Sequence, residues 1–128
     1  MLTYKSKGVI FLPEERTNKI SCSNYKCEVE VALGIIAGKW IPLILWTLGT
    51  EGTKRFGELK KSLSGVTQKM LTQQLRTLEK YGIVERTIYP IVPPVVEYSL
   101  TETGERLIPI LKELDTWGKE YIEHKKNL

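Results

Sequence analysis

A group of amide, hydroxyl and basic side chains between residues 68 and 76 has the chemistry needed to read the edges of DNA bases. The group consists of Gln68, Lys69, Thr72, Gln73 and Arg76, whose spacing places them on one face of a helix. Glutamine can form two hydrogen bonds with adenine, arginine and lysine can bind guanine O6 and N7, and threonine offers a hydroxyl or a methyl group. The pattern therefore predicts a base-reading surface, on which Lys69 and Arg76 also suit phosphate contacts.

Positive charge is concentrated around this segment. The 128-residue chain carries 19 basic and 15 acidic residues, and the resulting net charge of +4 alone identifies no partner. Residues 52–92 hold eight basic and three acidic side chains, a net charge of +5, whereas residues 93–128 have a net charge of −2. Contacts to DNA phosphates, which add affinity without sequence information, are predicted for Lys54, Arg55, Lys60, Lys61 and Arg86.

Other reactive side chains are few. The two cysteines, Cys22 and Cys27, are too few for the disulfide framework of a small secreted protein, and they favour a cytoplasmic location. Together with the single His124 they do not match the spacing of zinc ligands, so we expect no metal and no cofactor. We find no nucleophile motif, phosphate-binding glycine loop or leader segment, and the longest apolar run, 40–48, is far shorter than the ~20 residues of a membrane span. An enzyme and a membrane partner are therefore not expected.

Hydrophobic spacing predicts the elements that position these residues. Residues 1–26 show no helical or strand period and are expected to form an irregular arm. Val29, Leu33 and Ile36 share one face of a first helix. The apolar run 40–48 predicts a buried central helix, because it is apolar nearly all round and has proline only near its start.

A helix-turn-helix is predicted between residues 56 and 82. Its first helix is marked by Phe56, Leu59 and Leu63, after which Ser64-Gly65 interrupts the pattern. Thr67 is a suitable N-cap for the second helix, and Gly82 is placed to end it. The apolar stripe of this second helix consists of Leu71, Leu75 and Leu78.

Two strands and a final helix complete the predicted fold. Residues 83–89 and 95–100 are rich in Val, Ile, Thr and Tyr and predict a hairpin, whose connection contains three prolines and should protrude as a stiff loop. Thr101 is suited to cap a last helix, Pro109 should bend it, and residues 123–127 should fray as a charged tail. The apolar positions of this helix are Leu107, Ile110, Leu111, Leu114, Trp117 and Tyr121.

The order of these elements predicts a mainly α (α+β) fold. We interpret it as a winged helix-turn-helix with a two-stranded antiparallel wing and a long C-terminal dimerisation helix, in which the second helix of the motif enters the major groove of double-stranded DNA. The domain would span residues 27–122, between the arm 1–26 and the tail 123–128. The last helix carries more apolar side chains than a small core can cover, and a symmetric partner would remove this association hazard.

Several spaced motifs resemble the HxlR-type transcriptional regulators, a branch of the MarR-like winged-helix proteins. The resemblance covers about three quarters of the chain, from Cys27 to about Trp117-Gly118, and rests on Cys27-Glu28-Val29-Glu30, Gly38-Lys39-Trp40, Arg55-Phe56-Gly57-Glu58-Leu59, the segment from Lys69 to Arg76, Tyr89-Pro90 and the segment from Pro93-Pro94 to Thr101. It implies a homodimeric bacterial DNA-binding regulator on a pseudo-palindromic operator. The first and last helices would then form the dimer interface through Val29, Leu33, Leu111, Leu114, Trp117 and Tyr121.

The resemblance also implies a role for the cysteines. In many HxlR-type members the cysteine aligned with Cys27 senses oxidants or electrophiles, and Cys22 would act here as a resolving thiol. The predicted helix N-terminus and Lys26 favour a reactive thiolate, whereas Glu28 and Glu30 oppose it. The alternative is that Cys27 is a small buried hydrophobic residue.

Two further alternatives remain at this point. The polar helix face could be merely solvated, or the winged helix could be a protein-interaction module that does not bind DNA. The sequence also departs from the family in the wing, where Val95 occupies a position that usually carries Arg or Lys. Arg86 or the loop backbone would then have to supply the wing contact.

Overall fold

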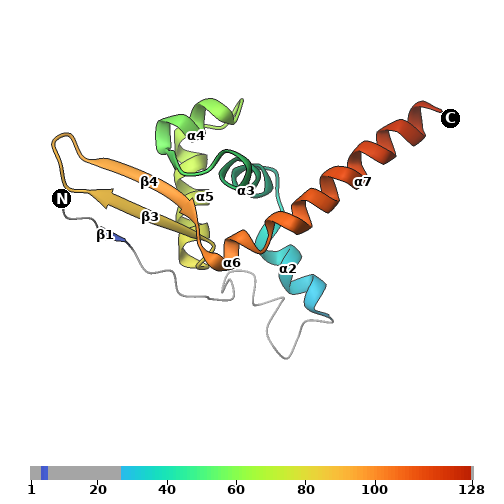
Figure 1. Ribbon diagram of the computed structural model, residues 1–128, viewed down its shortest axis with the longest axis horizontal. Helices are drawn as coiled ribbons and strands as arrows, with labels where there is room; N and C mark the ends of the chain where they lie inside the picture. The colour runs from blue at the N-terminus through green and yellow to red at the C-terminus, as the bar shows by residue number, and fades with distance from the viewer. Residues whose placement is uncertain (1–3, 6–26, 128) are drawn as a thin grey trace.

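The computed structural model describes residues 4–5 and 27–127. Figure 1 shows a small helical body from which a β-hairpin extends on one side and a long helix on the other. In chain order the elements are β1 (Tyr4–Lys5), α2 (Glu28–Ile36), α3 (Trp40–Glu51), β2 (Lys54–Arg55), α4 (Phe56–Ser62), α5 (Gln68–Lys80), β3 (Val84–Tyr89), β4 (Val95–Leu100), α6 (Glu102–Glu105) and α7 (Ile108–Lys126). The mainly helical winged helix-turn-helix predicted from the sequence is confirmed.

The core is built around α3. The side chains of Ile41, Ile44 and Leu45 are almost completely buried in it, as the apolar run predicted. Leu59 of α4 and the stripe Leu71, Leu75 and Leu78 of α5 pack into the same cluster. Each fully buried aliphatic side chain contributes about 1.5–3 kcal/mol, so this cluster holds the two helices of the motif against α3.

The boundaries of the helix-turn-helix follow from its capping residues. The backbone N–H of Met70 donates to Thr67 Oγ1 at 3.1 Å, so Thr67 caps α5 as predicted. At the other end Gly82 has a positive φ of 72°, and the N–H of Ile83 returns to the carbonyl of Leu78 at 2.9 Å. The orientation of α5 is therefore fixed at both ends.

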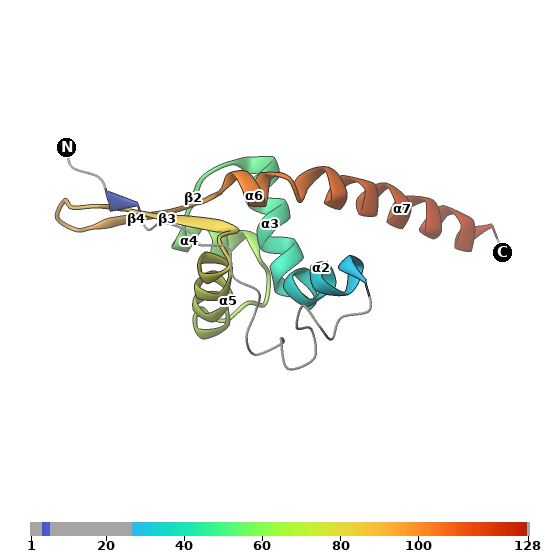
Figure 2. The same cartoon turned by 90° about the horizontal axis from the view of Figure 1, so that it is seen from below.

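The sheet is larger than the predicted two-stranded wing. Strands β3 and β4 pair from Val84↔Leu100 to Tyr89↔Val95, and the strand order is β1-β3-β4-β2. The added strands β1 and β2 have two residues each, too few for an alternating pattern to reveal them. The prediction of an irregular arm is wrong at Tyr4–Lys5, where β1 pairs with β3; the rest of the arm lies outside the described residues. Figure 2 shows the hairpin in profile, with α5 on one side of it.

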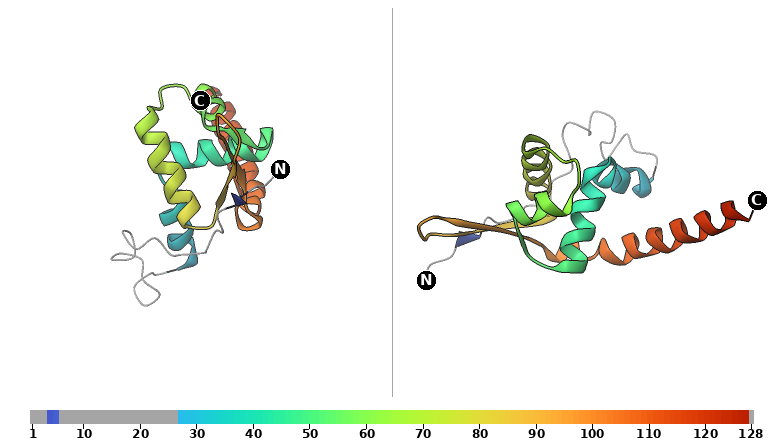
Figure 3. Two further views of the ribbon diagram at one scale, coloured as in Figure 1. Left: turned by 90° about the vertical axis from the view of Figure 1, so that its left-hand side faces the viewer. Right: turned by 90° about the horizontal axis from the view of Figure 1, so that it is seen from above.

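The C-terminal region forms two helices where one bent helix was predicted. Thr101 caps α6 by accepting the N–H of Gly104 at 3.1 Å, and its hydroxyl donates to the carbonyl of Gly82 at 2.6 Å, with that of Ile83 also within reach at 3.1 Å. Pro109 lies in the first turn of α7, where its missing N–H costs no helical hydrogen bond, and the chain is interrupted just before it, at residues 106–107. The charged residues expected to fray continue α7 to Lys126, and α7 projects away from the body (Figure 3).

A sharp turn before α3 and one close contact on it set the positions of its neighbouring helices. Helices α2 and α3 meet at an angle of 84°, next to Gly38 with its positive φ of 109°. Gly49 of α3 lies against Ile108 in the first turn of α7, where a larger residue would collide with the Ile108 side chain.

Within the described residues no single helix is long and apolar enough to cross a membrane; only α2 and α3 taken together reach that threshold.

Candidate nucleic-acid interface

The five residues predicted to read bases lie together on α5. Gln68, Lys69, Thr72, Gln73 and Arg76 line one open depression on the helix surface. They are exposed except for Thr72, which is half-buried, and the buried leucine stripe of α5 faces the core. The hydroxyl of Thr72 donates to the carbonyl of Gln68 at 2.8 Å. Thr72 is therefore left with its methyl group and its oxygen lone pairs for a contact with DNA.

A second pocket connects α5 with the hairpin. Its volume is about 290 Å³, and its lining includes Arg76 of α5 and Arg86 of β3. Two guanidinium groups that are ten residues apart in sequence are thus brought together at the base of the wing. Glu79 lines the same pocket and offsets part of their charge. Arg86 pairs with Tyr98 near the base of the hairpin, whereas Val95 pairs with Tyr89 at its far end, so Arg86 does not occupy the place of the charge missing at Val95.

The remaining basic residues divide into two groups. Lys60 and Lys61 are exposed in the last turn of α4, and Arg55 is exposed at its N-cap, where its backbone N–H donates to Glu58 Oε1 at 2.8 Å. Lys54 differs, because its Nζ lies 3.1 Å from Glu51 Oε1 and its side chain is only 20% exposed. The phosphate contact of Lys54 stays a prediction, in which phosphate would have to compete with Glu51 for the amine. Glu51 is the last residue of α3 and Lys54 the first of β2, so this ion pair depends on the turn between the two elements.

The wing has little charge of its own. From residue 87 to residue 100 it contains no lysine or arginine, and its one charged side chain is Glu97. A hydrogen bond with Glu97 and the charge of that carboxylate raise the pKa of the Tyr89 hydroxyl above its ordinary value of 10.0. At the tip Val92 is 99% exposed. Beyond Arg86 the wing therefore presents apolar and hydroxyl groups rather than cations.

Most residues of the predicted dimer interface are exposed. Val29 and Leu33 lie on α2, while Leu114, Trp117 and Tyr121 follow one side of α7, and each is about half exposed or more. The rings of Trp117 and Tyr121 stack with centroids 5.3 Å apart. Leu111 is the exception: it is 6% exposed and packs into the core, so its assignment to the interface is wrong. Ile122 is 55% exposed and was left out of the predicted interface because it borders the predicted tail. It follows Leu114 by eight residues, a spacing that places both on the same side of the helix.

Cys27 occupies the N-cap position of α2 and is exposed. The alternative that it is a small buried hydrophobic residue is therefore wrong. Its side chain caps no backbone N–H, and Glu28 and Glu30 lie in the first turn of the helix. Cys22 lies outside the described residues. Within the part of the chain that the structure describes, no group of three His, Cys, Asp or Glu side chains could hold a metal ion.

Comparison with known proteins places this geometry in a family. Residues 35–126 match the family described as HxlR-like helix-turn-helix. An uncharacterized HTH-type transcriptional regulator of Methanothermobacter thermautotrophicus is 50% identical over 103 residues, which cover 80% of this chain and 78% of that protein.

Solved structures agree with this match. The redox regulator HypR in its reduced form is 42% identical with a TM-score of 0.74, covering 80% of this chain and 100% of that one. Diamide-treated YodB from Bacillus subtilis is 34% identical with a TM-score of 0.64, covering 76% and 95%. The family match over residues 35–126 includes the helix-turn-helix, the wing and α7. The chain therefore belongs to the HxlR-like helix-turn-helix family of transcriptional regulators.

Proposed function

We propose that this regulator binds a pseudo-palindromic operator as a homodimer and reads bases with α5. The observation that carries the proposal is the open face of α5, on which Gln68, Lys69, Gln73 and Arg76 are exposed beside Thr72. A helix of 13 residues capped at Thr67 and supported by a buried leucine stripe presents these side chains in a fixed orientation. This arrangement suits insertion into a major groove, where such side chains distinguish base pairs.

The surrounding cations would set the register of α5 on the duplex. Arg55, Lys60 and Lys61 are exposed and Arg86 lines the pocket at the base of the wing, and these four residues are the proposed phosphate contacts. In a two-fold dimer they would provide about eight contacts, and the two recognition helices would meet successive major grooves ~34 Å apart. The dimer itself would form through the exposed apolar side chains of α2 and α7.

Binding to the DNA upstream of its own gene, followed by fluorescence anisotropy over a series of salt concentrations, tests the proposal. Eight phosphate contacts predict a slope of roughly −7 in a plot of log K against log salt. A scrambled duplex of the same length is the control for non-specific binding. A slope near zero would show that α5 docks on protein or is only solvated, and equal affinity for both duplexes would show that α5 does not read bases.

We further propose that Cys27 senses oxidants or electrophiles. The support is its exposure at the start of α2, on the helix that carries Val29 and Leu33, together with the similarity to the redox regulator HypR. A disulfide or adduct at this position would change the packing of the proposed dimer face. Mild oxidant should therefore change both operator affinity and non-reducing gel mobility in the wild type and not in Cys27→Ser. Identical responses of the two proteins would rule out Cys27 as the sensor. The variant Cys22→Ser tests separately whether Cys22 acts as the resolving thiol.

A further inference from the structure

A lysine outside the basic segment 52–92 lies close to the proposed DNA surface. Lys39 is exposed immediately before α3, and its Nζ is 4.7 Å from the centroid of the Trp40 ring. The Trp40 side chain is buried, and its Cη2 atom would lie 3.9 Å from a methyl group added at Gly65, in the turn between α4 and α5. The Lys39 ammonium group, the indole ring and this turn are therefore neighbours.

The ammonium group of Lys39 is available to an anion. Among residues 4–5 and 27–127 no carboxylate forms an ion pair with it, whereas the amines of Lys54 and Lys119 pair with Glu51 and Asp115. An ammonium held over an aromatic ring keeps N–H donors that point away from the ring. Because the ring already restricts the long side chain, less conformational entropy is lost when the ammonium binds an anion.

The turn in front of α5 is where a strand of an inserted DNA duplex would pass. Between Leu63 and Gln68 the chain has no charged side chain, so this turn offers a phosphate neither a cation nor a repelling carboxylate of its own. A helix with its side chains is 10–12 Å across and the major groove is about 12 Å wide, so the strands that border the groove run directly beside an inserted helix. The strand nearest the N-terminus of α5 would therefore cross this turn.

We propose that Lys39 contacts an operator phosphate beside the turn that precedes α5, and that Trp40 is the platform that holds the ammonium group there. The inference rests on the proposed function and adds a residue to it. In a two-fold dimer the contact occurs twice, which raises the number of phosphate contacts from about eight to about ten and steepens the expected slope of log K against log salt from roughly −7 to roughly −9. A phosphate contact carries no sequence information, so operator and scrambled duplex gain the same affinity from it.

The salt dependence of DNA binding by the wild type and by Lys39→Gln, measured by fluorescence anisotropy, tests this contact. The variant lacks two contacts per dimer, so its slope should be shallower by about 1.8, and the affinity advantage of the wild type should fall about 3.5-fold with each doubling of salt. The scrambled duplex should show the same change. Lys39→Arg keeps the charge and the stacking on Trp40 and should bind like the wild type. Lys112→Gln, which removes an exposed cation of α7, should leave the slope unchanged.

Thermal unfolding separates a DNA contact from a structural role of Lys39. Loss of an exposed cation–π contact should lower the Tm of Lys39→Gln by no more than about 5 °C. The proposal is overturned if Lys39→Gln keeps the wild-type slope, if its affinity falls while the slope is unchanged, if Lys112→Gln loses as much, or if Lys39→Arg does not restore binding. A wild type with a slope near zero would refute the proposed function as a whole, whereas a steep wild-type slope that Lys39→Gln does not change refutes this contact alone.

Discussion

Replacing Thr101 by valine should destabilise the domain far more than its half-buried position suggests. The Thr101 hydroxyl donates to the Gly82 carbonyl at 2.6 Å and accepts the Gly104 N–H at 3.1 Å, so one oxygen links the end of α5 to the start of α6. Valine keeps the shape and removes both bonds. The lost N-cap costs about 1 kcal/mol, and the carbonyl left without a partner costs about 1–2 kcal/mol more. The expected loss is therefore about 2–3 kcal/mol, which corresponds to a Tm lowered by roughly 10–20 °C in a domain of this size.

Thermal and urea unfolding, followed by circular dichroism at one protein concentration, measure this effect. Thr50→Val is the matched control, because the Thr50 hydroxyl donates to the Trp46 carbonyl of its own helix at 2.7 Å in an exposed position. That variant should change stability by less than about 0.5 kcal/mol. Thr101→Ser, which keeps the hydroxyl, should recover most of the loss. If Thr101→Val costs no more than Thr50→Val, the hydroxyl does not connect the two helices in the way described.

Four further variants test the proposed interfaces and the wing. Arg76→Ala should weaken operator binding by about 1–3 kcal/mol and non-specific binding much less. Lys54→Ala should leave the slope of log K against log salt unchanged, because the Lys54 amine already pairs with Glu51. Fluorescence anisotropy measures both quantities. Trp117→Ala should raise the dimer dissociation constant at least tenfold in sedimentation equilibrium, and an unchanged constant would place the interface elsewhere. Glu97→Gln should return the pKa of Tyr89 toward 10.0, observed as phenolate absorbance that develops at lower pH than in the wild type.

Local signals predicted local structure well. Thr67 and Gly82 carry their information in residue type and spacing, since a hydroxyl at an N-cap and a glycine after a helix act within a few residues. The leucine stripe of α5 likewise followed from a period that requires no knowledge of its partner. For the same reason the five polar residues of α5 could be placed on one face before the fold was known.

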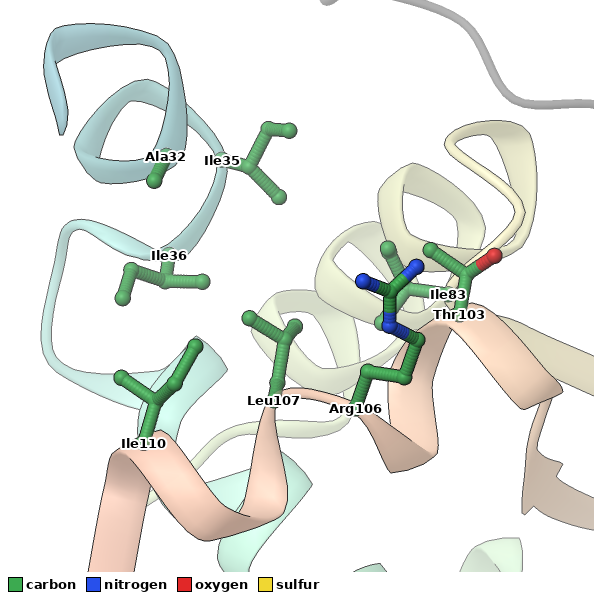
Figure 4. Close-up of a pocket in the computed structure, with 8 residues that line it drawn as sticks. All are labelled: Ala32, Ile35, Ile36, Ile83, Thr103, Arg106, Leu107 and Ile110. Atoms are coloured by element: carbon green, nitrogen blue, oxygen red, sulfur yellow. The ribbon is translucent and has the colours of Figure 1, made fainter. Parts of the chain in front are cut away.

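Errors arose where the outcome depended on a distant partner. Leu111 and Leu114 belong to the same apolar stripe, and only the packing of α3 against the first turns of α7 decides that Leu111 is buried while Leu114 is exposed. Lys54 shows the same dependence, because its partner Glu51 faces it only after the chain turns from α3 into β2. The apolar pocket between α2 and the start of α7, lined by Ile35, Leu107 and Ile110 (Figure 4), could not be predicted, since its walls come from segments about 70 residues apart.

The contact of Gly49 with Ile108 has a geometric consequence for any two-fold assembly of this chain. It seats the first turn of α7 directly on α3, and beyond the buried Leu111 the helix projects away from the body. In a two-fold assembly, a rotation of about 5° about this contact would displace a point ~34 Å away by about 3 Å, close to the rise of one base pair. Small changes in how two copies of α7 pack would thus alter the operator spacing that the pair can span by a whole base-pair step.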